Sequence, residues 1–244
     1  MRSSIAIIGG TGIGNRLALL PGKPIMVPTA EGPLRAKHVT IEGRSVYLFQ
    51  RHSAGHKTPP HRVNYKAAAL GCKALGIENV FATAAVGSLR EDWGPGTFAA
   101  CSDFLDLSFR RLTMWDREVR HIDFTEPFSP ALRTSISESC NRLGVDCHSK
   151  AVYVCGDGPR YETPEEIQMY RKLGGDIVGM TASSEAIAFR ELGIGYACLA
   201  IVTNLGSGLA GYELTHEEVV EVMESSGEKA VKILFGAIGE LSHA

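Results

Sequence analysis

The amino-acid sequence predicts an α/β fold, a single domain with a central mixed, largely parallel sheet flanked by helices. Short apolar runs rich in β-branched residues alternate along the chain with longer segments of helical periodicity. This alternation is typical of parallel strands that are joined by helical crossovers. The length of 244 residues suffices for one sizeable hydrophobic core and is short for two catalytic domains. One domain over residues 1–244 is therefore expected.

The expected strands are short, solid apolar runs that end in glycine or in a polar residue. Runs of this kind are typical of strands that are buried on both faces of a sheet. They are Ile5 to Ile8, Ser45 to Phe49, Val80 to Ala85, Ala151 to Cys155, Ile177 to Met180 and Tyr196 to Thr203.

The expected helices are longer segments in which apolar residues recur at helical spacing. Thr163 and Thr215 fit helix N-caps, because glutamates follow each of them within the next three residues. The expected helices are Asn64 to Leu75, Ser129 to Leu143, Thr163 to Leu173, Ser183 to Leu192 and Thr215 to Leu241.

Composition and charge exclude several classes of function. Hydrophobic residues make up 44% of the chain and charged residues 21%, and the formal net charge is −2. This composition is ordinary for a globular protein, and it offers no polycationic surface for nucleic acid or for an anionic membrane. No apolar run approaches the roughly 18 to 20 residues of a spanning helix. A soluble, cytoplasmic protein with no nucleic-acid and no membrane partner is expected.

The six cysteines are scattered along the chain, with no C-x-x-C pair and no histidine at metal-ligand spacing. Reduced, buried thiols explain this pattern better than a disulfide framework or a zinc site. The sequence therefore predicts no metal site.

Polar and glycine-rich segments follow the predicted strands directly. In open α/β sheets, ligands bind beyond the carboxyl ends of the strands, so these segments hold the candidate functional residues. They are Gly9-Gly10-Thr11-Gly12, Arg51-His52, Ala84-Ala85-Val86-Gly87-Ser88, Gly158-Pro159-Arg160-Tyr161-Glu162-Thr163, Met180-Thr181 and Thr203-Asn204.

The first of these segments resembles a dinucleotide-binding loop, and we reject that interpretation. A dinucleotide fold needs a crossover helix of ordinary length directly after the glycine turn. Only Asn15 to Leu20 stand between the loop and the Pro21-Gly22 turn, which leaves no room for that helix. The loop can still bind a single phosphate through its backbone N–H groups.

Taken together, these motifs are similar to those of the trimeric purine nucleoside phosphorylase and methylthioadenosine phosphorylase family. The resemblance covers almost the whole chain. Besides the strand-end segments given above, it rests on His56, Pro59-Pro60-His61, Val63-Asn64-Tyr65, Leu89-Arg90-Glu91, Gly179 and Glu185.

The resemblance implies an activity and an assembly. Such enzymes cleave the N-glycosidic bond of a purine nucleoside with inorganic phosphate and release the free base and ribose 1-phosphate. Phosphate is a co-substrate and the nucleophile, so neither a cofactor nor a protein nucleophile is expected. The expected partners are a purine nucleoside and phosphate, and the expected assembly is a homotrimer or a dimer of such trimers.

The resemblance also implies which residues bind phosphate. They are Thr11, Arg51, His52, the backbone amide of Ala85 and the hydroxyl of Thr181. The arginine offers a bidentate fork, while the histidine and the hydroxyls offer further donors. A solvated surface pair at Arg51-His52 and a simple turn-capping role for Thr11 are the alternatives.

Four further residues are expected around the sugar. Tyr65 and Met180 would face the ribose, although a core methionine is the ordinary alternative. His121 resembles the histidine that family members lend to the 5′ pocket of a neighbouring subunit. His216 resembles the one that contacts the ribose 5′-hydroxyl in 6-oxopurine phosphorylases. For each histidine the alternative is an exposed surface position.

Two residues predict the purine that is cleaved. An ionised Glu162 accepts a hydrogen bond from the N1–H of a 6-oxopurine and would face a lone pair in adenine. Asn204 can donate to O6 and accept from N7–H at once. With His52, these two are the catalytic residues that the resemblance implies, and Tyr161 is expected to line the same pocket. A neighbour of a helix N-cap for Glu162 and a strand-end turn residue for Asn204 are the alternatives. Hydrogen-bond mismatches of this kind cost about 1 to 3 kcal/mol each, so inosine and guanosine are the expected substrates.

Three alternatives to this function remain open. A phosphorylase of S-methyl-5′-thioinosine or of S-methyl-5′-thioadenosine would carry nearly the same motifs. A nucleoside-binding module without turnover is the alternative outside enzymes, and the presence of both a phosphate set and a purine set argues against it.

Overall fold

Nine strands form one mixed sheet in a computed structural model, which describes residues 4–52, 57–211 and 213–241. The motif residue His56 lies outside these ranges. The strands are β1 (Ser4–Gly9), β2 (Lys23–Val27), β3 (Leu34–Ile41), β4 (Arg44–Gln50), β5 (Ile77–Ser88), β6 (Phe98–Asp106), β7 (Cys147–Cys155), β8 (Ile177–Gly179) and β9 (Gly195–Leu205).

The strand order is β2-β3-β4-β1-β5-β8-β7-β6-β9, and β9 also pairs with β5. The last five strands therefore close into a ring, from which β1, β4, β3 and β2 extend as a curved sheet. Five of the nine pairings are parallel and four are antiparallel. The predicted mixed α/β sheet is confirmed, with parallel pairs only narrowly in the majority.

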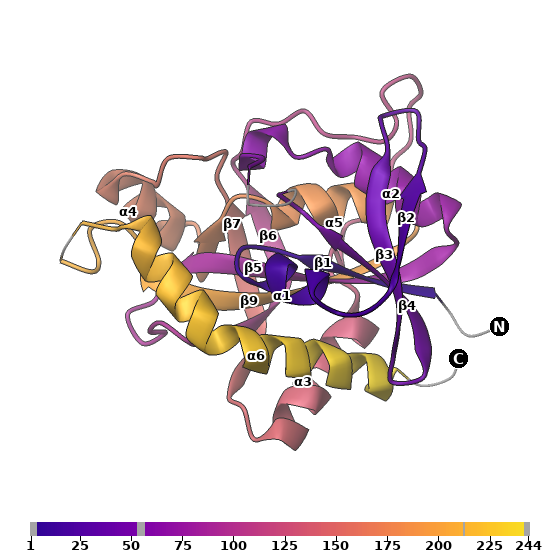
Figure 1. Cartoon of the computed structure of the whole chain (residues 1–244). Helices are drawn as coiled ribbons and strands as arrows, with labels where there is room; N and C mark the ends of the chain where they lie inside the picture. The colour runs from indigo at the N-terminus through magenta and orange to yellow at the C-terminus, as the bar shows by residue number, and fades with distance from the viewer. Residues whose placement is uncertain (1–3, 53–56, 212, 242–244) are drawn as a thin grey trace.

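The helices cover the two faces of this sheet (Figure 1). All five expected helices are present, and a short first helix and a single 3₁₀ turn accompany them. The helical elements are α1 (Ile13–Ala18), η1 (Pro60–Arg62), α2 (Tyr65–Ala74), α3 (Pro130–Leu143), α4 (Pro164–Lys172), α5 (Ala182–Glu191) and α6 (His216–Glu240).

Strand β1 shows how the sheet separates two hydrophobic cores. Because side chains alternate along a strand, Ala6 and Ile8 pack into the core beneath α2 and α5. Ile5 and Ile7 pack on the opposite face, into the core formed with α1, α3 and α6. All four side chains are almost fully buried, so the solid apolar run correctly predicted a strand that is covered on both faces.

The helix starts follow the sequence signals closely. Thr163 accepts from the backbone N–H of Glu166, and the Glu166 carboxylate accepts from the N–H of Thr163, which together form a capping box at the start of α4. Thr215 accepts from the N–H of Glu218 at the start of α6. Both helices are thereby anchored next to loops that reach the carboxyl ends of the strands.

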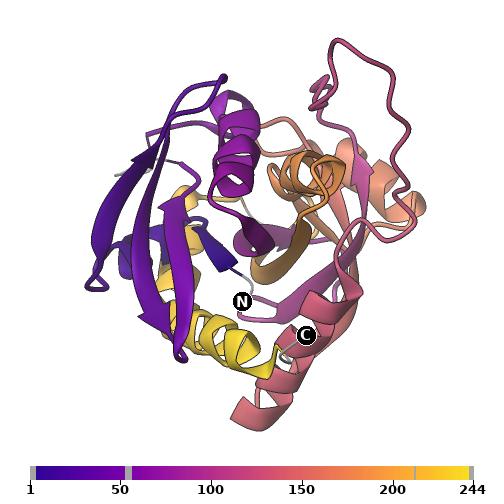
Figure 2. The same ribbon diagram turned by 90° about the vertical axis from the view of Figure 1, so that its right-hand side faces the viewer.

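One long segment without helix or strand joins β6 to α3. Part of it projects as a loop (Figure 2), while the N–H of Met114 donates to Glu191 of α5 and Phe128 is fully buried. Phe109 and Val119 on this segment are 95% and 84% exposed, and Arg120 lies over the ring of Trp115 at 3.9 Å from its centroid. Loops of this length in a compact protein are usually functional.

Candidate active site

A cavity of about 430 Å³ opens where the carboxyl ends of β1, β4, β5, β7, β8 and β9 converge. It collects ten of the twelve residues that the sequence singled out. These are Thr11, Arg51, His52, Ala85, Tyr161, Glu162, Met180, Thr181, Asn204 and His216. The segments that follow the strands thus meet around one cavity, as expected for an open α/β sheet.

The glycine turn after β1 brings two strands and an arginine together. The N–H of Gly10 donates to Oγ1 of Thr83 at 3.0 Å, and the N–H of Arg51 donates to the carbonyl of Gly9. A Cβ on Gly10 would lie 2.6 Å from Nη1 of Arg51 and 2.5 Å from the carbonyl oxygen of Thr83. Only glycine at this position lets the guanidinium lie directly against the turn.

The fork of Arg51 is already occupied by a buried carboxylate. Its Nε and Nη2 donate to the two oxygens of Glu185 at 2.6 and 2.7 Å, and Nη1 donates to the carbonyl of Thr83 at 2.8 Å. Tyr196 donates to the same carboxylate at 2.6 Å. The expected bidentate grip of Arg51 on phosphate is therefore not available through Nε and Nη2. Two of the five guanidinium N–H groups remain for a ligand.

The charge of Arg51 is balanced inside the protein. Both side chains of the pair are at most 3% exposed. Burial alone would lower the pKa of Arg51, but the adjacent Glu185 carboxylate raises it above its ordinary value. The arginine thus stays protonated, and the pair adds no net charge to the floor of the cavity.

Thr181 offers a free hydroxyl because another residue caps its helix. Thr181 is the N-cap of α5 and makes no side-chain capping bond, unlike Thr163 and Thr215. Instead, the phenol oxygen of Tyr153 accepts from the backbone N–H groups of Thr181 and Ala182 at 3.1 and 3.4 Å. The Thr181 hydroxyl is left to face the cavity, where it can donate to an anion.

His52 is oriented by one backbone contact. Its Nδ1 lies 2.7 Å from the carbonyl oxygen of Thr58, and a carbonyl only accepts, so Nδ1 carries a proton. For Nε2 also to donate to a phosphate oxygen, the imidazole must be protonated on both nitrogens.

Glu162 and Asn204 line the same cavity. Burial raises the pKa of the Glu162 carboxyl above its ordinary value, and the carboxylate lies against Gly156, where a Cβ would be 2.8 Å from Oε1. Oδ1 of Asn204 accepts from Thr203 at 2.8 Å, and Nδ2 donates to the carbonyl of Leu205 at 2.8 Å. One lone pair and one N–H of the amide stay available.

Met180 and His216 also line this cavity. A Cβ on Gly158 would lie 2.3 Å from the sulfur of Met180, so the loop after β7 is packed directly on this methionine. His216 is exposed at the first position of α6 and forms part of the rim.

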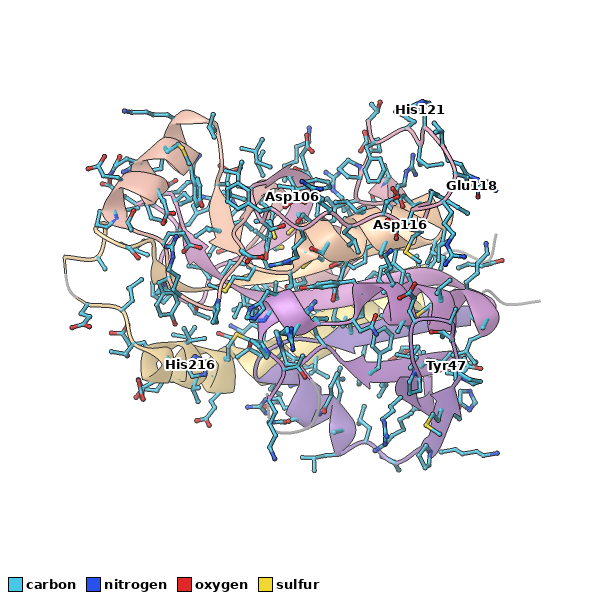
Figure 3. All side chains as sticks on the ribbon, turned by 90° about the horizontal axis from the view of Figure 1, so that it is seen from above. Tyr47, Asp106, Asp116, Glu118, His121 and His216 are labelled. Carbon is cyan, nitrogen blue, oxygen red and sulfur yellow. The ribbon has the colours of Figure 1, made fainter. Side chains whose placement is uncertain are left out.

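Tyr65 and His121 do not line this cavity. The Tyr65 hydroxyl donates to the carbonyl of Pro60 at 2.8 Å, and its side chain lines a neighbouring cavity of about 830 Å³ instead. The expected place of Tyr65 against the ribose is therefore not found within this chain. His121 is exposed on the segment between β6 and α3, far from His216 (Figure 3). A role for it in a neighbouring subunit stays a prediction.

Reasoning from sequence missed three contributors to the site. Glu185 was noted only as part of a motif, and neither Tyr153 nor Arg110 was considered. Arg110 follows β6, a strand that the apolar-run criterion did not detect, so nothing marked it as a strand-end residue. Within the described residues, no group of three or more His, Cys, Asp or Glu side chains is placed to hold a metal ion.

Comparison with known proteins identifies the family of this chain. The family model described as the phosphorylase superfamily matches residues 4–239. The chain belongs to the phosphorylase superfamily. Curated phosphorylases resemble it over most of their length. One is the 6-oxopurine nucleoside phosphorylase of Pyrococcus furiosus, which is 40% identical over 246 residues, covering 96% of this chain and 91% of that protein.

Two further phosphorylases extend this comparison. A probable S-methyl-5′-thioinosine phosphorylase of Methanopyrus kandleri is 40% identical over 234 residues, covering 95% of this chain and 90% of that protein. A crystal structure of a mutant adenosine/methylthioadenosine phosphorylase from Schistosoma mansoni, in complex with methylthioadenosine, superposes with a TM-score of 0.91 at 27% identity. It covers 97% of this chain and 91% of that one. The fold of this phosphorylase is therefore that of a nucleoside phosphorylase.

Proposed function

We infer that this phosphorylase cleaves 6-oxopurine nucleosides, inosine and guanosine, with inorganic phosphate to the free base and ribose 1-phosphate. The observation that carries the inference is the placement of Glu162 and Asn204 in the same cavity as Thr181 and Arg51. The residues proposed to bind the purine and those proposed to bind phosphate then share one cavity, which Met180 also lines. Curated relatives named 6-oxopurine nucleoside phosphorylases, at about 40% identity, support this substrate class.

In the proposed reaction, a phosphate oxygen attacks C1′ of the ribose while the bond from C1′ to N9 of the purine breaks. The electron pair of that bond moves into the base, and the base takes up at N7 the proton that the attacking hydrogen phosphate gives up, which leaves ribose 1-phosphate and the neutral base. Thr181, Arg51 and His52 would hold the phosphate below C1′, which removes much of the entropic cost of the encounter. Asn204 would accept a hydrogen bond from the new N7–H and so stabilise the leaving group.

Glu162 provides the preference for a 6-oxopurine. Its carboxylate accepts from N1–H, and the free N–H of Asn204 donates to O6. Adenine presents a lone pair at N1 and an amino group at position 6, so both contacts would be lost or repulsive. Buried polar groups left unpaired in this way are the basis of strong discrimination between substrates.

A second candidate substrate is S-methyl-5′-thioinosine. Relatives named probable S-methyl-5′-thioinosine phosphorylases are up to 40% identical to this chain. Leu214 and Val219 line the same cavity as His216. The part of the cavity that we propose for the 5′ group of the ribose therefore offers apolar surface as well as an imidazole. An imidazole gains little from a thioether, which is a weak acceptor, and for this reason we place the hydroxyl substrate first.

The experiment is an assay of base release with and without phosphate. The purified enzyme is given inosine, guanosine, adenosine and the methylthio analogues of inosine and adenosine. Phosphate-dependent cleavage of inosine at least tenfold faster than of adenosine is the expected result. A tenfold preference for methylthioinosine would establish the second candidate. Binding of nucleoside without turnover would establish a binding module.

Three further features belong to the same proposal. We propose that the reaction needs no cofactor, because phosphate itself is the nucleophile. We also propose a homotrimer, or a dimer of trimers, in which the segment carrying His121 reaches a neighbouring subunit, and we propose a cytoplasmic location. No helix in the described ranges is long and apolar enough to cross a membrane.

A further inference from the structure

Arg110 lies behind the active site and makes an unusually large set of contacts. Its side chain is 13% exposed and does not line the cavity. Its five N–H groups lie within hydrogen-bond distance of six acceptors, so at least one N–H is shared between two of them. The acceptors are the Tyr65 hydroxyl (3.2 Å), Oγ of Ser184 (2.8 Å), Oδ1 of Asp157 (3.0 Å) and the carbonyls of Gly156 (3.2 Å), Asp157 (2.9 Å) and Met180 (2.8 Å).

These acceptors belong to segments that are far apart in the sequence. Gly156 and Asp157 follow β7, Met180 follows β8, and Ser184 lies in the first turn of α5. The segment after β7 also carries Glu162. The Arg110 side chain therefore joins the backbone of the loop that carries Glu162 to the backbone of Met180, which directly precedes Thr181.

Three of the acceptors are carbonyl oxygens that converge on one nitrogen, Nη2. Carbonyl oxygens that point at one another repel, and only a donor or a cation between them makes the arrangement favourable. The N–H of Gly156 also donates to the carbonyl of Gly179, so Arg110 adds to a backbone contact that already joins the loop after β7 to the end of β8.

Gly156 links Arg110 to the carboxylate of Glu162. Arg110 holds the carbonyl of Gly156, and the Glu162 carboxylate lies against the α-carbon of that glycine. On its other side Arg110 holds the carbonyl of Met180, whose sulfur packs on Gly158 of the same loop. A shift of Arg110 would therefore move Glu162 and Met180 relative to each other.

Lysine at this position could not reproduce the network. A guanidinium is planar and presents five N–H donors in a fixed fork, whereas an ammonium presents three donors from one point. Lysine would keep the positive charge near Asp157 and lose most of the convergent contacts. The charge and the geometry of Arg110 can thus be separated by experiment.

We propose that Arg110 is a positioning residue that sets the distance between Glu162 and Met180, and so controls the discrimination between 6-oxopurine and 6-aminopurine nucleosides. This inference rests on the proposed function. Arg110 touches neither the purine nor the phosphate in this scheme. Its effect should therefore appear in the use of the nucleoside and hardly at all in the binding of phosphate.

The test compares Arg110→Ala and Arg110→Lys with the wild-type enzyme. In Arg110→Ala, kcat/KM for inosine should fall by about 50-fold, because small misplacements of positioned groups can cost about two orders of magnitude. The ratio of inosine to adenosine cleavage should fall at least fivefold, with the KM for phosphate changing less than threefold. Arg110→Lys, which keeps the charge, should lose the inosine preference with little loss of thermal stability.

Chemical rescue separates positioning from a purely structural role. Millimolar methylguanidinium, well below denaturing concentrations, should restore at least a tenth of the inosine activity of Arg110→Ala and should not affect Glu162→Gln. Arg171→Ala is the matched control, because Arg171 is a surface arginine whose side chain donates to a carboxylate, that of Glu91. Arg171→Ala should leave the ratio of inosine to adenosine cleavage unchanged.

The outcomes distinguish this inference from the proposed function. If the wild-type enzyme does not cleave inosine with phosphate, the proposed function is wrong. If it does, but both Arg110 variants keep the wild-type ratio of inosine to adenosine, the positioning role is refuted. The positioning role is also refuted if Arg110→Ala loses thermal stability and methylguanidinium does not restore its activity, while Arg110→Lys keeps the wild-type ratio of inosine to adenosine cleavage.

Discussion

Glu185 holds Arg51 by two hydrogen bonds, from Nε at 2.6 Å and from Nη2 at 2.7 Å, and both side chains are almost fully buried. The carboxylate comes from the first turn of α5, and the guanidinium follows β4. The pair thus fixes the arginine at the floor of the cavity in one orientation. Two N–H groups of Arg51 remain for a ligand, which in our proposal is phosphate, and the ion pair fixes their directions before the ligand binds.

Replacement of Glu185 by glutamine should damage both phosphate binding and stability. Glutamine offers only one acceptor atom and places an NH₂ group against the Arg51 donors. Breaking one side of a buried ion pair costs about 3 to 5 kcal/mol. We expect the KM for phosphate to rise at least tenfold in Glu185→Gln, measured by initial rates at saturating inosine, and the melting temperature to fall.

Tyr196→Phe is the control for this experiment. It removes one hydrogen bond to Glu185 and leaves the two contacts with Arg51 in place. Its KM for phosphate should stay within about threefold of the wild-type value. An unchanged phosphate KM in Glu185→Gln, with the protein folded, would show that Arg51 needs no orienting partner.

Glu162→Gln should lower kcat/KM for inosine by about 100-fold or more, since a buried acceptor facing N1–H is replaced by an amide. Burial raises the pKa of Glu162, so its ionised form is lost at a higher pH than for an ordinary glutamate. On the acid side, wild-type kcat/KM for inosine should therefore fall as the pH drops through this raised pKa. That acid limb should be absent in Glu162→Gln, and an identical limb in both enzymes would assign the titration to another group.

Asn204→Asp should shift the preference from inosine toward adenosine. A protonated carboxyl can donate to N7 while its other oxygen accepts from the 6-amino group, whereas the contact with O6 is lost. The measurement is the ratio of kcat/KM for adenosine to that for inosine. A ratio that stays constant or falls would count against a contact between Asn204 and the base.

His216→Val should erase or reverse a preference for inosine over methylthioinosine. The imidazole at the cavity rim can hydrogen-bond a 5′-hydroxyl, and valine suits the thioether better. The two nucleosides are compared by kcat/KM in both enzymes. A wild-type enzyme that already favours methylthioinosine tenfold would mean that His216 does not contact the 5′ group.

Light scattering at micromolar concentration tests the assembly. We expect the mass of three chains, or of six. His121→Ala should lower kcat/KM without changing the phosphate KM, because the histidine would act in a neighbour's sugar pocket. A fully active monomer would refute both the trimer and this role of His121.

The strands that the sequence predicted are those in which nearly every residue is buried. Strand β9 is covered on both faces from Tyr196 to Asn204, so the run of apolar residues was unambiguous. Strand β3 alternates between buried and exposed residues, as at Leu34, Arg35 and Ala36, and a search for solid apolar runs cannot find it. In strand β6, three small residues follow Phe98, and Asp103 and Asp106 interrupt its apolar half, which makes it a poor match to a solid apolar run.

The candidate site residues also fall into those that the sequence could predict and those that it could not. Residues that directly follow buried strands, such as Thr181, were predicted because the strands themselves were recognised. Arg110 follows an unrecognised strand, and three of its six acceptors are backbone carbonyls, which leave no mark in a sequence. The pairing of Arg51 with Glu185 joins residues that are 134 positions apart, and neither periodicity nor spacing reports a contact of that range.

The closed ring of strands also bears on how this protein avoids self-association through its sheet. Because β9 returns to β5, within the described residues only β2 has a neighbouring strand on one side alone. An unpaired strand of this kind can recruit a strand from another molecule and start aggregation. Strand β2 has only five residues and begins with Lys23 and Pro24. A proline has no N–H to donate and the lysine is charged, so the strand most open to intermolecular pairing is also poorly suited to it.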